Sequence, residues 1–525
     1  MMRELKLEDM TLEQKIGQLV CVRWFREEED MKDIFKALAR GEVGAMQIRW
    51  QDESTTRNLI RDIRNAAGYP VLICADMESG FPGSKLKMPY QMAIGSANDE
   101  RLAYELARIT AIEAKNAGFS VVWGPIVDIA AEGQINRINR CFSDRVEDII
   151  KYSSAMIRGY QDEGMICTAK HFLTGYDEWM DSHMCATGSW LDEEEVMKTV
   201  AQPYFAAMKD ANLSGIMTNH TIFHKIDADR PGTLSSRILN IIRDQGFDGI
   251  IMSDSLAMMA IEEEFGKRES LGLAIAAGVD MVLPTFSLTY REVHDALMEA
   301  YRKGVFTEER LNEAVRRVLE AQEKTKKPAS ATELTEEQKK LVDELNRKSL
   351  CAVIKDGVEL KLNPDTKKLF VLLYEENYTG TPSKELQTGN WFFKDMVEEK
   401  QKMIQAEFPD AEIMLLHEFP NQGEMTRICR ARAKVDEVIF FTFCRRSSYL
   451  GSDSITERIK NLLISSMDKI SAVVHMGNPY EIKKFIDAPR IFVGVTGSDC
   501  EKYAVKALKG EFVPTGKLPV EGCVD

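Results

Sequence analysis

The sequence predicts an α/β protein in which a TIM-like (β/α)8 barrel is followed by an α/β/α sandwich. Residues 1–322 alternate short β-branched segments with longer amphipathic ones, residues 323–346 are rich in charge, and strand–helix alternation resumes in residues 347–525. Strand–helix repetition over so long a first region indicates a parallel sheet with helical crossovers. A closed barrel holds that many units more simply than the alternative, an open doubly wound sheet.

Seven strands are expected in the barrel region, each an apolar and mostly β-branched run. They are residues 43–48, 71–75, 120–123, 166–169, 215–218, 250–253 and 279–283. The segments between them read as helices: in residues 100–117, for example, apolar side chains recur at three and four positions. That spacing places them on one face of a helix.

The remainder of the chain is expected to form a linker and a second domain. Residues 323–346 lack any strand pattern, and we interpret them as a linker that ends in a helix. Five further strands are expected at residues 369–374, 412–416, 437–443, 472–476 and 491–495. With helical segments between them, they predict an open sheet covered by helices on both faces.

Charge and composition exclude several classes of protein. The chain has 83 acidic and 68 basic residues, a net charge of −15, which argues against nucleic acid or an anionic membrane as the main partner. Charges interrupt residues 1–20, so no secretory signal is expected, and no apolar run is long enough to span a membrane. The ten cysteines form no Cys-x-x-Cys pair, so we expect free thiols in a reducing cytoplasm and no zinc site.

Polar side chains follow the strands of the predicted barrel. The apolar runs are directly followed by Asp76, Asp128, Lys170, His171, Asn219, His220, Asp254 and Pro284. Barrel enzymes assemble their active sites at the C-terminal ends of the strands. The repetition of this pattern in several units therefore predicts a catalytic site at that rim.

One carboxylate stands out as a candidate nucleophile. Asp254 ends the apolar run of DGIIMSDSLAMM, which delivers it to the rim on a rigid strand. A carboxylate nucleophile needs such a placement, partly shielded from water and facing the ligand. The alternative is that Asp254 caps the helix that follows.

A second candidate group lies in the loop after the fourth expected strand. Asp181 and His183 are two residues apart, so the carboxylate can orient the imidazole and raise its pKa towards that of a general acid. The alternatives are a solvated loop histidine, or a metal site formed with Asp177. Nothing in the spacing requires a metal.

Further polar residues could recognise a polyhydroxylated ligand. Lys170 and His171 offer donors to hydroxyl groups, Asp76 can accept two hydroxyl hydrogen bonds, and Arg140 can donate two parallel ones. An ion pair across the rim is the alternative for Lys170. His475, in HMGNPY, is more simply explained as part of a structural loop.

These motifs together resemble glycoside hydrolase family 3. The segments MTLEQKIGQLV, ADMESG, GPIVDIA, RCFSD, KHF…DSH, GFDGIIMSDSLAM, AGVDMVLP, FTEERLNEAVRRVL and PTGKLPV occur in the order seen in that family. The Asp-x-His element is similar to the β-N-acetylglucosaminidase branch, in which such a dyad replaces the carboxylic acid of the β-glucosidases. The resemblance covers nearly the whole chain and is densest up to residue 322.

The resemblance implies a retaining exo-glycosidase that removes terminal β-linked N-acetylglucosamine-type residues without a cofactor or a metal. Asp254 would attack the anomeric carbon, and His183, oriented by Asp181, would act as acid and then as base. Asp76, Arg140, Lys170 and His171 would bind the sugar. The expected partner is a small carbohydrate, and the sequence leaves the oligomeric state open.

Two departures from the family pattern keep alternatives open. Ser79-Gly80-Phe81 stands where the family usually has Gly-Gly-Arg, and Leu173-Thr174-Gly175 replaces the usual Pro-Gly. A neutral imidazole as acid/base also leaves less negative charge in the site, so phosphate could replace water as the acceptor. A β-glycoside phosphorylase and a non-catalytic sugar-binding relative are therefore the alternatives.

Overall fold

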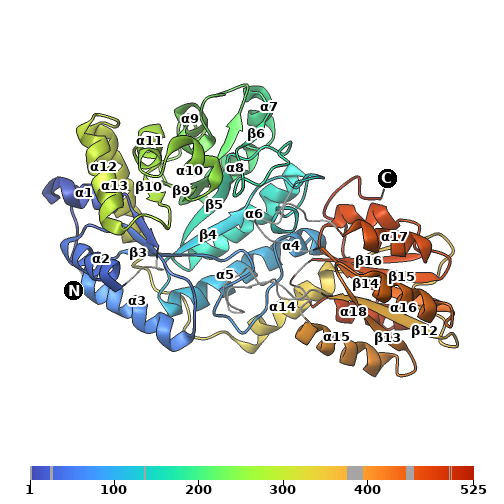
Figure 1. The fold of residues 1–525 in the computed structure, drawn as a ribbon. Coiled ribbons are helices and arrows are strands. Elements are labelled where there is room, and N and C mark those ends of the chain that lie inside the picture. Colours follow the sequence, from blue (N-terminus) through green and yellow to red (C-terminus); the bar gives the residue numbers. More distant parts are fainter. Residues whose placement is uncertain are drawn as a thin grey trace. The chain divides into compact units, whose positions relative to one another are not determined.

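The computed structural model describes residues 3–23, 28–134, 137–374, 394–444, 455–495, 497 and 499–524. The chain forms two compact units (Figure 1). The first unit comprises Met1–Lys85, Glu100–Gln134 and Val146–Gln338, and the second comprises Leu86–Asp99, Ile135–Arg145 and Lys339–Asp525. From the sequence, the two short early segments of the second unit were expected to be part of the barrel region.

The first unit contains an eight-stranded parallel barrel. In sheet order its strands are β1 (Cys21–Arg23), β2 (Ala45–Gln47), β3 (Leu72–Asp76), β4 (Val121–Ile126), β5 (Ile166–Phe172), β7 (Gly215–Thr218), β9 (Ile250–Ser255) and β10 (Met281–Leu283). Every neighbouring pair is parallel. A parallel bridge between Val20 and Val282 joins the last strand to the first and closes the sheet. The predicted barrel is confirmed.

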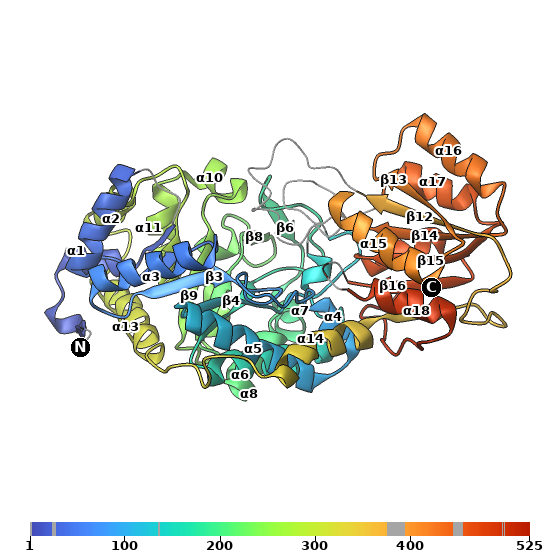
Figure 2. The same cartoon turned by 90° about the horizontal axis from the view of Figure 1, so that it is seen from below.

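Helices surround these strands in both views (Figures 1 and 2). They are α1 (Leu12–Gln18), α2 (Glu28–Arg40), α3 (Glu53–Ala67), α5 (Glu100–Ala117), α6 (Val146–Asp162), α7 (Glu193–Lys198), α8 (Gln202–Ala211), α9 (Ser236–Arg243), α10 (Met259–Phe265), α11 (Glu269–Ala277), α12 (Tyr290–Arg302) and α13 (Glu308–Lys324), with the 3₁₀ helices η1 (Leu7–Asp9) and η3 (Gly232–Leu234). Side-chain caps define several starts: Thr11 and Thr289 form capping boxes at α1 and α12, and Asp52 caps α3. A short parallel pair, β6 (Thr187–Ser189) and β8 (Thr221–Phe223), forms a separate sheet.

The barrel core draws on all eight strands. One cluster of buried side chains comprises Cys21, Ala45, Leu72, Cys74, Val121, Trp123, Ile166, Met217, Ile250, Met252, Met281 and Leu283, together with Val318 and Ala321 of α13. Burial of such side chains is the main favourable term in folding. It gives the residues at the strand ends a rigid base.

The structure corrects the sequence-based strand list at four places, and one of them is β4, which continues to Ile126, three residues beyond its expected end. β1 was not expected, because its three residues follow directly on the apolar end of α1 and read as a continuation of that helix. β5 and β9 extend beyond their expected ends and include Lys170–Phe172 and Asp254–Ser255. These polar residues are therefore parts of strands and not of loops.

The second unit is built on a six-stranded sheet. Its order is β11 (Cys351–Ile354), β16 (Arg490–Gly494), β15 (Ile470–Met476), β14 (Glu437–Phe443), β12 (Lys368–Tyr374) and β13 (Glu412–His417). Only the β11–β16 pair is antiparallel among the described strands of this sheet. The five expected strands are confirmed, and β11 is an addition.

Helices lie on both faces of this sheet. Its described helices are α4 (Met92–Ala97), α14 (Glu336–Ser349), which begins in the first unit, α15 (Lys394–Glu407), α16 (Gln422–Arg432), α17 (Glu457–Ser465), α18 (Glu501–Lys509), η2 (Ile138–Arg140) and η5 (Pro479–Phe485). The connections through α15 and α16 run in opposite directions across the sheet, so right-handed crossovers place them on opposite faces. α15 packs against α18, and α17 packs against η5. The predicted α/β/α sandwich is confirmed.

No helix in the described part of the chain combines the length and the apolar character needed to cross a bilayer.

Candidate active site

Asp254 lies at the penultimate position of β9, half-buried at the rim of the barrel. Its Oδ1 accepts a hydrogen bond from the backbone N–H of Ser255 at 2.6 Å. The next helix, α10, begins at Met259 and has Met258 at its N-cap position, so Asp254 does not cap it. The capping alternative is therefore wrong.

Three imidazoles lie within electrostatic range of this carboxylate. Burial alone raises the pKa of Asp254, but His171, His220, the backbone N–H of Ser255 and His183 outweigh it and hold the pKa at about 2. The carboxylate is therefore ionised at neutral pH. His183 makes the last of these contributions, so it lies within electrostatic range of Asp254.

The Asp181–His183 pair forms within the loop after β5. Nδ1 of His183 lies 2.7 Å from Oδ1 of Asp181, and the backbone N–H of His183 donates to the same oxygen at 3.0 Å. A carboxylate only accepts, so Nδ1 carries the proton and Nε2 is the nitrogen that can exchange one. Asp181 is buried, whereas the His183 side chain is 27% exposed.

Two carboxylates, Glu178 and Asp177, hold this loop in place. Glu178 accepts hydrogen bonds from the N–H of Gly175 at 2.7 Å and from the hydroxyl of Thr221. Asp177 accepts from Oγ of Ser189 at 2.6 Å and from the N–H of Trp190 at 2.7 Å. Asp177 thus links the loop to β6. Among the described residues, no group of three or more acidic, histidine or cysteine side chains is placed to hold a metal ion.

Lys170 spans the rim between β5 and β3. Its Nζ lies 2.6 Å from Oδ1 of Asp76 and 2.9 Å from Oε1 of Glu78. The ion pair that was the alternative for Lys170 therefore forms. Lys170 is almost fully buried, but the Asp76 side chain remains 56% exposed and can still accept hydrogen bonds from a ligand.

His171 belongs to a second carboxylate–imidazole pair. Asp128 lies just after β4. Its Oδ1 accepts a hydrogen bond from the backbone N–H of His171 at 2.8 Å, and its Oδ2 lies 2.8 Å from Nδ1 of the His171 ring. Both side chains are buried. This pairing fixes the ring orientation, and His171 is the largest of the contributions that lower the pKa of Asp254.

His220 follows β7 and holds the peptide after the candidate nucleophile. Its Nε2 lies 2.9 Å from the carbonyl oxygen of Ser255, and its Nδ1 lies 2.9 Å from Oγ1 of Thr233. Burial lowers the pKa of His220 although the Asp254 carboxylate opposes this effect, which favours the neutral ring. Because a carbonyl only accepts, Nε2 donates its hydrogen to the carbonyl oxygen of Ser255.

Arg23 reaches the same turn from the end of β1. Its Nη2 donates to Oγ of Ser255 at 2.5 Å, and its guanidinium lies 3.9 Å from the centre of the Phe286 ring. Ser255 is therefore held at its carbonyl by His220 and at its hydroxyl by Arg23. Arg23 and Ser255 were not predicted from the sequence; the short VCVR run that ends in Arg23 was the one available signal.

Two further predicted positions are Arg140 and Phe81. Arg140 is the half-buried last residue of η2 and belongs to the second unit, so its role in sugar binding stays a prediction. Phe81, at the position of the missing cation, is buried and packs edge-on against Trp50 at 4.9 Å and Phe119 at 5.7 Å between ring centres. It fills the core and offers no group to a ligand.

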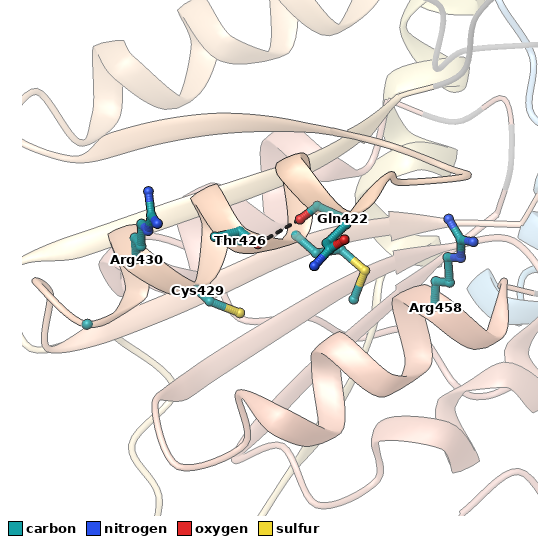
Figure 3. A pocket seen from close by; sticks show the side chains of 7 residues that line it. Gln422, Thr426, Cys429, Arg430 and Arg458 are labelled. Carbon is teal, nitrogen blue, oxygen red and sulfur yellow. Dashed lines mark hydrogen bonds between the residues drawn. The ribbon is translucent and has the colours of Figure 1, made fainter.

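A groove of about 610 Å³ occurs on the second unit, beside α16 (Figure 3). Its lining comprises Gln422, Met425, Thr426, Cys429, Arg430, Ala433 and Arg458. None of these side chains is a carboxylate or an imidazole. The groove therefore lacks the groups for acid/base or nucleophilic chemistry on a glycoside, in contrast to the rim of the barrel.

Comparison with known proteins decides the family. The model of the glycosyl hydrolase family 3 N-terminal domain matches residues 11–321. The chain belongs to glycosyl hydrolase family 3. The predicted assignment to the glycoside hydrolases of this family is confirmed.

Named relatives of this family 3 chain include two groups of enzymes. It is 28% identical over 331 residues to the beta-N-acetylglucosaminidase/beta-glucosidase of Cellulomonas fimi, a match that covers 60% of this chain and 57% of the relative. The match to the beta-hexosaminidase of Psychromonas ingrahamii is 27% identical over 246 residues and covers 45% of this chain and 72% of the relative. The predicted likeness to the β-N-acetylglucosaminidase branch is therefore confirmed.

Solved structures share the fold across nearly the whole family 3 chain. A glycoside hydrolase family 3 beta-N-acetylglucosaminidase from Paenibacillus sp. has a TM-score of 0.81 at 24% identity, and the match covers 97% of this chain and 99% of that one. The beta-glucoside phosphorylase BglX has a TM-score of 0.80 at 22% identity, with 98% and 94% covered. At these identities the likeness shows the fold alone.

Proposed function

We propose that this family 3 chain is a retaining exo-glycosidase that hydrolyses terminal β-linked N-acetylglucosamine-type residues. The observation that best supports this proposal is the lowered pKa of Asp254, to which His171, His220 and His183 contribute. A carboxylate that is ionised at neutral pH, within electrostatic range of an oriented imidazole, is the pair that the reaction needs. The names of the curated relatives support the amino-sugar substrate.

In the first step, the Asp254 carboxylate attacks the anomeric carbon as the bond to the leaving oxygen breaks. Protonated His183 donates its Nε2 proton to that oxygen, so the leaving group departs as a neutral alcohol. Asp181 stabilises the positive ring before the transfer, and the N–H of Ser255 holds one oxygen of Asp254 and leaves the other to react. The product is a glycosyl ester on Asp254.

In the second step, water enters on the face that the leaving group has vacated. Neutral His183 accepts a proton from this water at Nε2, the water oxygen bonds to the anomeric carbon, and Asp254 is released as a carboxylate. Two inversions at one carbon retain its configuration. Both steps consist of acid/base and covalent chemistry, so the proposal requires no cofactor.

The sugar would be recognised by the polar residues around this pair. Asp76 is the exposed acceptor for ring hydroxyls, Lys170 and His171 are buried donors, and Arg140 is proposed as a further donor. Lys170 is neutralised by Asp76 and Glu78, so the rim can bind an uncharged ligand. The ten cysteines are scattered along the sequence without any Cys-x-x-Cys pair, which supports our proposal that the enzyme works in the reducing cytoplasm.

A panel of chromogenic β-glycosides, assayed with and without inorganic phosphate, tests the proposed reaction. We expect the N-acetylglucosaminide to be cleaved fastest, and the free sugar to be released first as its β-anomer. Release of the α-anomer would contradict a retaining mechanism. Tight sugar binding without any cleavage would instead favour the non-catalytic alternative.

Phosphorolysis is a second candidate, because the acid/base is an imidazole. Once it has given up its proton His183 is neutral, whereas a carboxylic acid would become negative and repel an incoming phosphate. The fold likeness to BglX is compatible with this alternative. A sugar 1-phosphate product in the phosphate arm of the same panel would establish it, and an unchanged product profile would rule it out.

A further inference from the structure

The loop that carries Asp181 and His183 reverses the usual distribution of side chains. Glu178 and Asp181 are only 2% and 6% exposed, whereas Trp179 and Met180 between them are 73% and 52% exposed. Carboxylates normally face water, and large apolar side chains are normally covered. The loop therefore presents an apolar surface beside the candidate acid.

Other exposed apolar side chains occur in segments that follow strands of the first unit. The described part of this unit exposes seven large hydrophobic side chains, and all but Val305 lie in segments that follow β5, β6, β9 or β10. These six form what we call the apolar collar: Trp179, Met180, Met184, Trp190, Met259 and Phe286.

Hydrogen bonds link the segments of the apolar collar to one another and to the site. The carbonyl of Ser182, next to His183, accepts the N–H of Ala260, which follows Met259, at 3.3 Å. Asp177 of the loop accepts the N–H of Trp190. Phe286 lies under the guanidinium of Arg23, which binds the residue after Asp254.

The chemistry of the apolar collar indicates the kind of ligand. Several large apolar side chains exposed beside a candidate active site are typical of a ligand-binding surface. Methionine side chains are flexible and polarisable and adapt to ligands of different shape, and tryptophan and phenylalanine offer flat faces. None of the six side chains carries a charge, so an uncharged apolar group fits best.

We propose that the apolar collar is the leaving-group subsite and binds alkyl or aryl aglycones. This inference rests on the proposed function, in which His183 protonates the leaving oxygen. The group attached to that oxygen must then depart past the loop that carries His183, where Trp179, Met180 and Met184 are exposed. The enzyme would therefore prefer glycosides of apolar alcohols to glycosides whose leaving group is another sugar.

A series of alkyl β-N-acetylglucosaminides from methyl to hexyl tests this preference. The leaving alcohols have similar acidity, so differences in kcat/KM report binding of the chain. A fully buried methylene group contributes about 0.8 kcal/mol, which is roughly fourfold. With partial burial we expect kcat/KM to rise by about 10- to 100-fold across the series, chiefly through a lower KM.

Substitutions locate the effect. Trp179→Ala and Met184→Ala should each reduce the dependence of kcat/KM on chain length. Val305→Ala removes an exposed apolar side chain outside the collar and should follow the wild-type dependence. Melting temperatures of the variants verify that each one folds.

Hydrolysis of N-acetylglucosaminyl fluoride, whose leaving group has no chain, separates the two proposals. If the wild type releases fluoride but kcat/KM is independent of chain length, the subsite is refuted and the glycosidase stands. If it cleaves neither the fluoride nor any glycoside, the proposed function fails and the subsite with it. A flat dependence together with a dimer that Trp179→Ala dissociates would show that a second copy covers the collar.

Discussion

Two buried histidines, one in each unit, have nearly the same immediate surroundings. His220 follows β7 of the barrel and lies between Oγ1 of Thr233 and the carbonyl of Ser255, both at 2.9 Å. His475 in β15 of the sandwich lies between Oγ1 of Thr442 at 2.9 Å and the carbonyl of Asn478 at 3.0 Å. Burial lowers the pKa of both rings, that of His475 to about 4.

The difference lies in the charged groups near each ring. The Asp254 carboxylate opposes the effect of burial at His220, whereas at His475 the charge of Lys484 adds to it. The first ring therefore belongs to a group of imidazoles around one anion, and the second belongs to a structural strand end. In this chain the nearby carboxylate, and not burial alone, distinguishes His220 from His475.

Removal of that carboxylate should have the largest effect. Asp254→Ala should reduce kcat by about 10⁴-fold or more, because no other group can form the glycosyl intermediate. Asp254→Asn should lose turnover but still bind sugar. Both are measured by steady-state kinetics and by inhibitor titration, with His475→Gln as the control from the sandwich. Wild-type rates in either Asp254 variant would remove it as the nucleophile.

Loss of the candidate acid should depend on the leaving group. His183→Ala should reduce kcat/KM by about 10²- to 10⁴-fold on alkyl glycosides, whose alcohols need a proton to depart. On activated aryl glycosides the reduction in kcat/KM should be much smaller, since their phenolate leaving groups depart without protonation. Equal losses on both substrates would show that His183 acts in some other way.

The protonation of His475, the buried histidine of the sandwich, should affect the stability of the protein and not its turnover. Its folded pKa of about 4 lies below the ordinary 6.5, so the unfolded chain binds more protons between these values and stability falls as the pH drops through this window. At pH 5 we expect a loss of about 2 kcal/mol relative to pH 7.5, from 1.4 kcal/mol per pKa unit. His475→Gln should reduce that loss in denaturant titrations; an unchanged pH dependence would contradict this account.

Removal of either hydrogen bond that holds Ser255, from Arg23 or from His220, should have the smallest effect. Ser255→Ala removes the hydroxyl that Arg23 binds, and His220→Ala removes the donor to the Ser255 carbonyl. Each should lower kcat by roughly tenfold with little change in KM, the equivalent of one hydrogen bond. His220→Gln keeps a donor and should restore part of kcat. If KM changes and kcat does not, these hydrogen bonds to Ser255 do not position Asp254.

Local features of the site could be predicted from the sequence, and contacts between distant segments could not. Asp254 ends a continuous apolar run, and Asp181 and His183 are two residues apart, so both signals lie within a few residues. The bond from Arg23 to Ser255 joins residues 232 positions apart, and it depends on β1, a strand too short to have a pattern.

The fold could be predicted because its signals are also local in the sequence. Repeated strand–helix units are visible along the chain, and β7 has the bounds that the sequence predicted, Gly215–Thr218. The extension of β5 through Lys170–Phe172 was missed, because the pattern of an apolar strand ends where the polar residues begin. Pairing with neighbouring strands continues beyond that point.

The identity of the nucleophile is the central claim, and mass spectrometry of a trapped intermediate tests it most directly. A fluorosugar with a good leaving group forms the glycosyl-enzyme faster than water can release it. Our account predicts one sugar per chain, attached to the peptide that contains Asp254 and absent from Asp254→Ala. A sugar on any other residue, or substrate turnover without a trappable adduct, would contradict it.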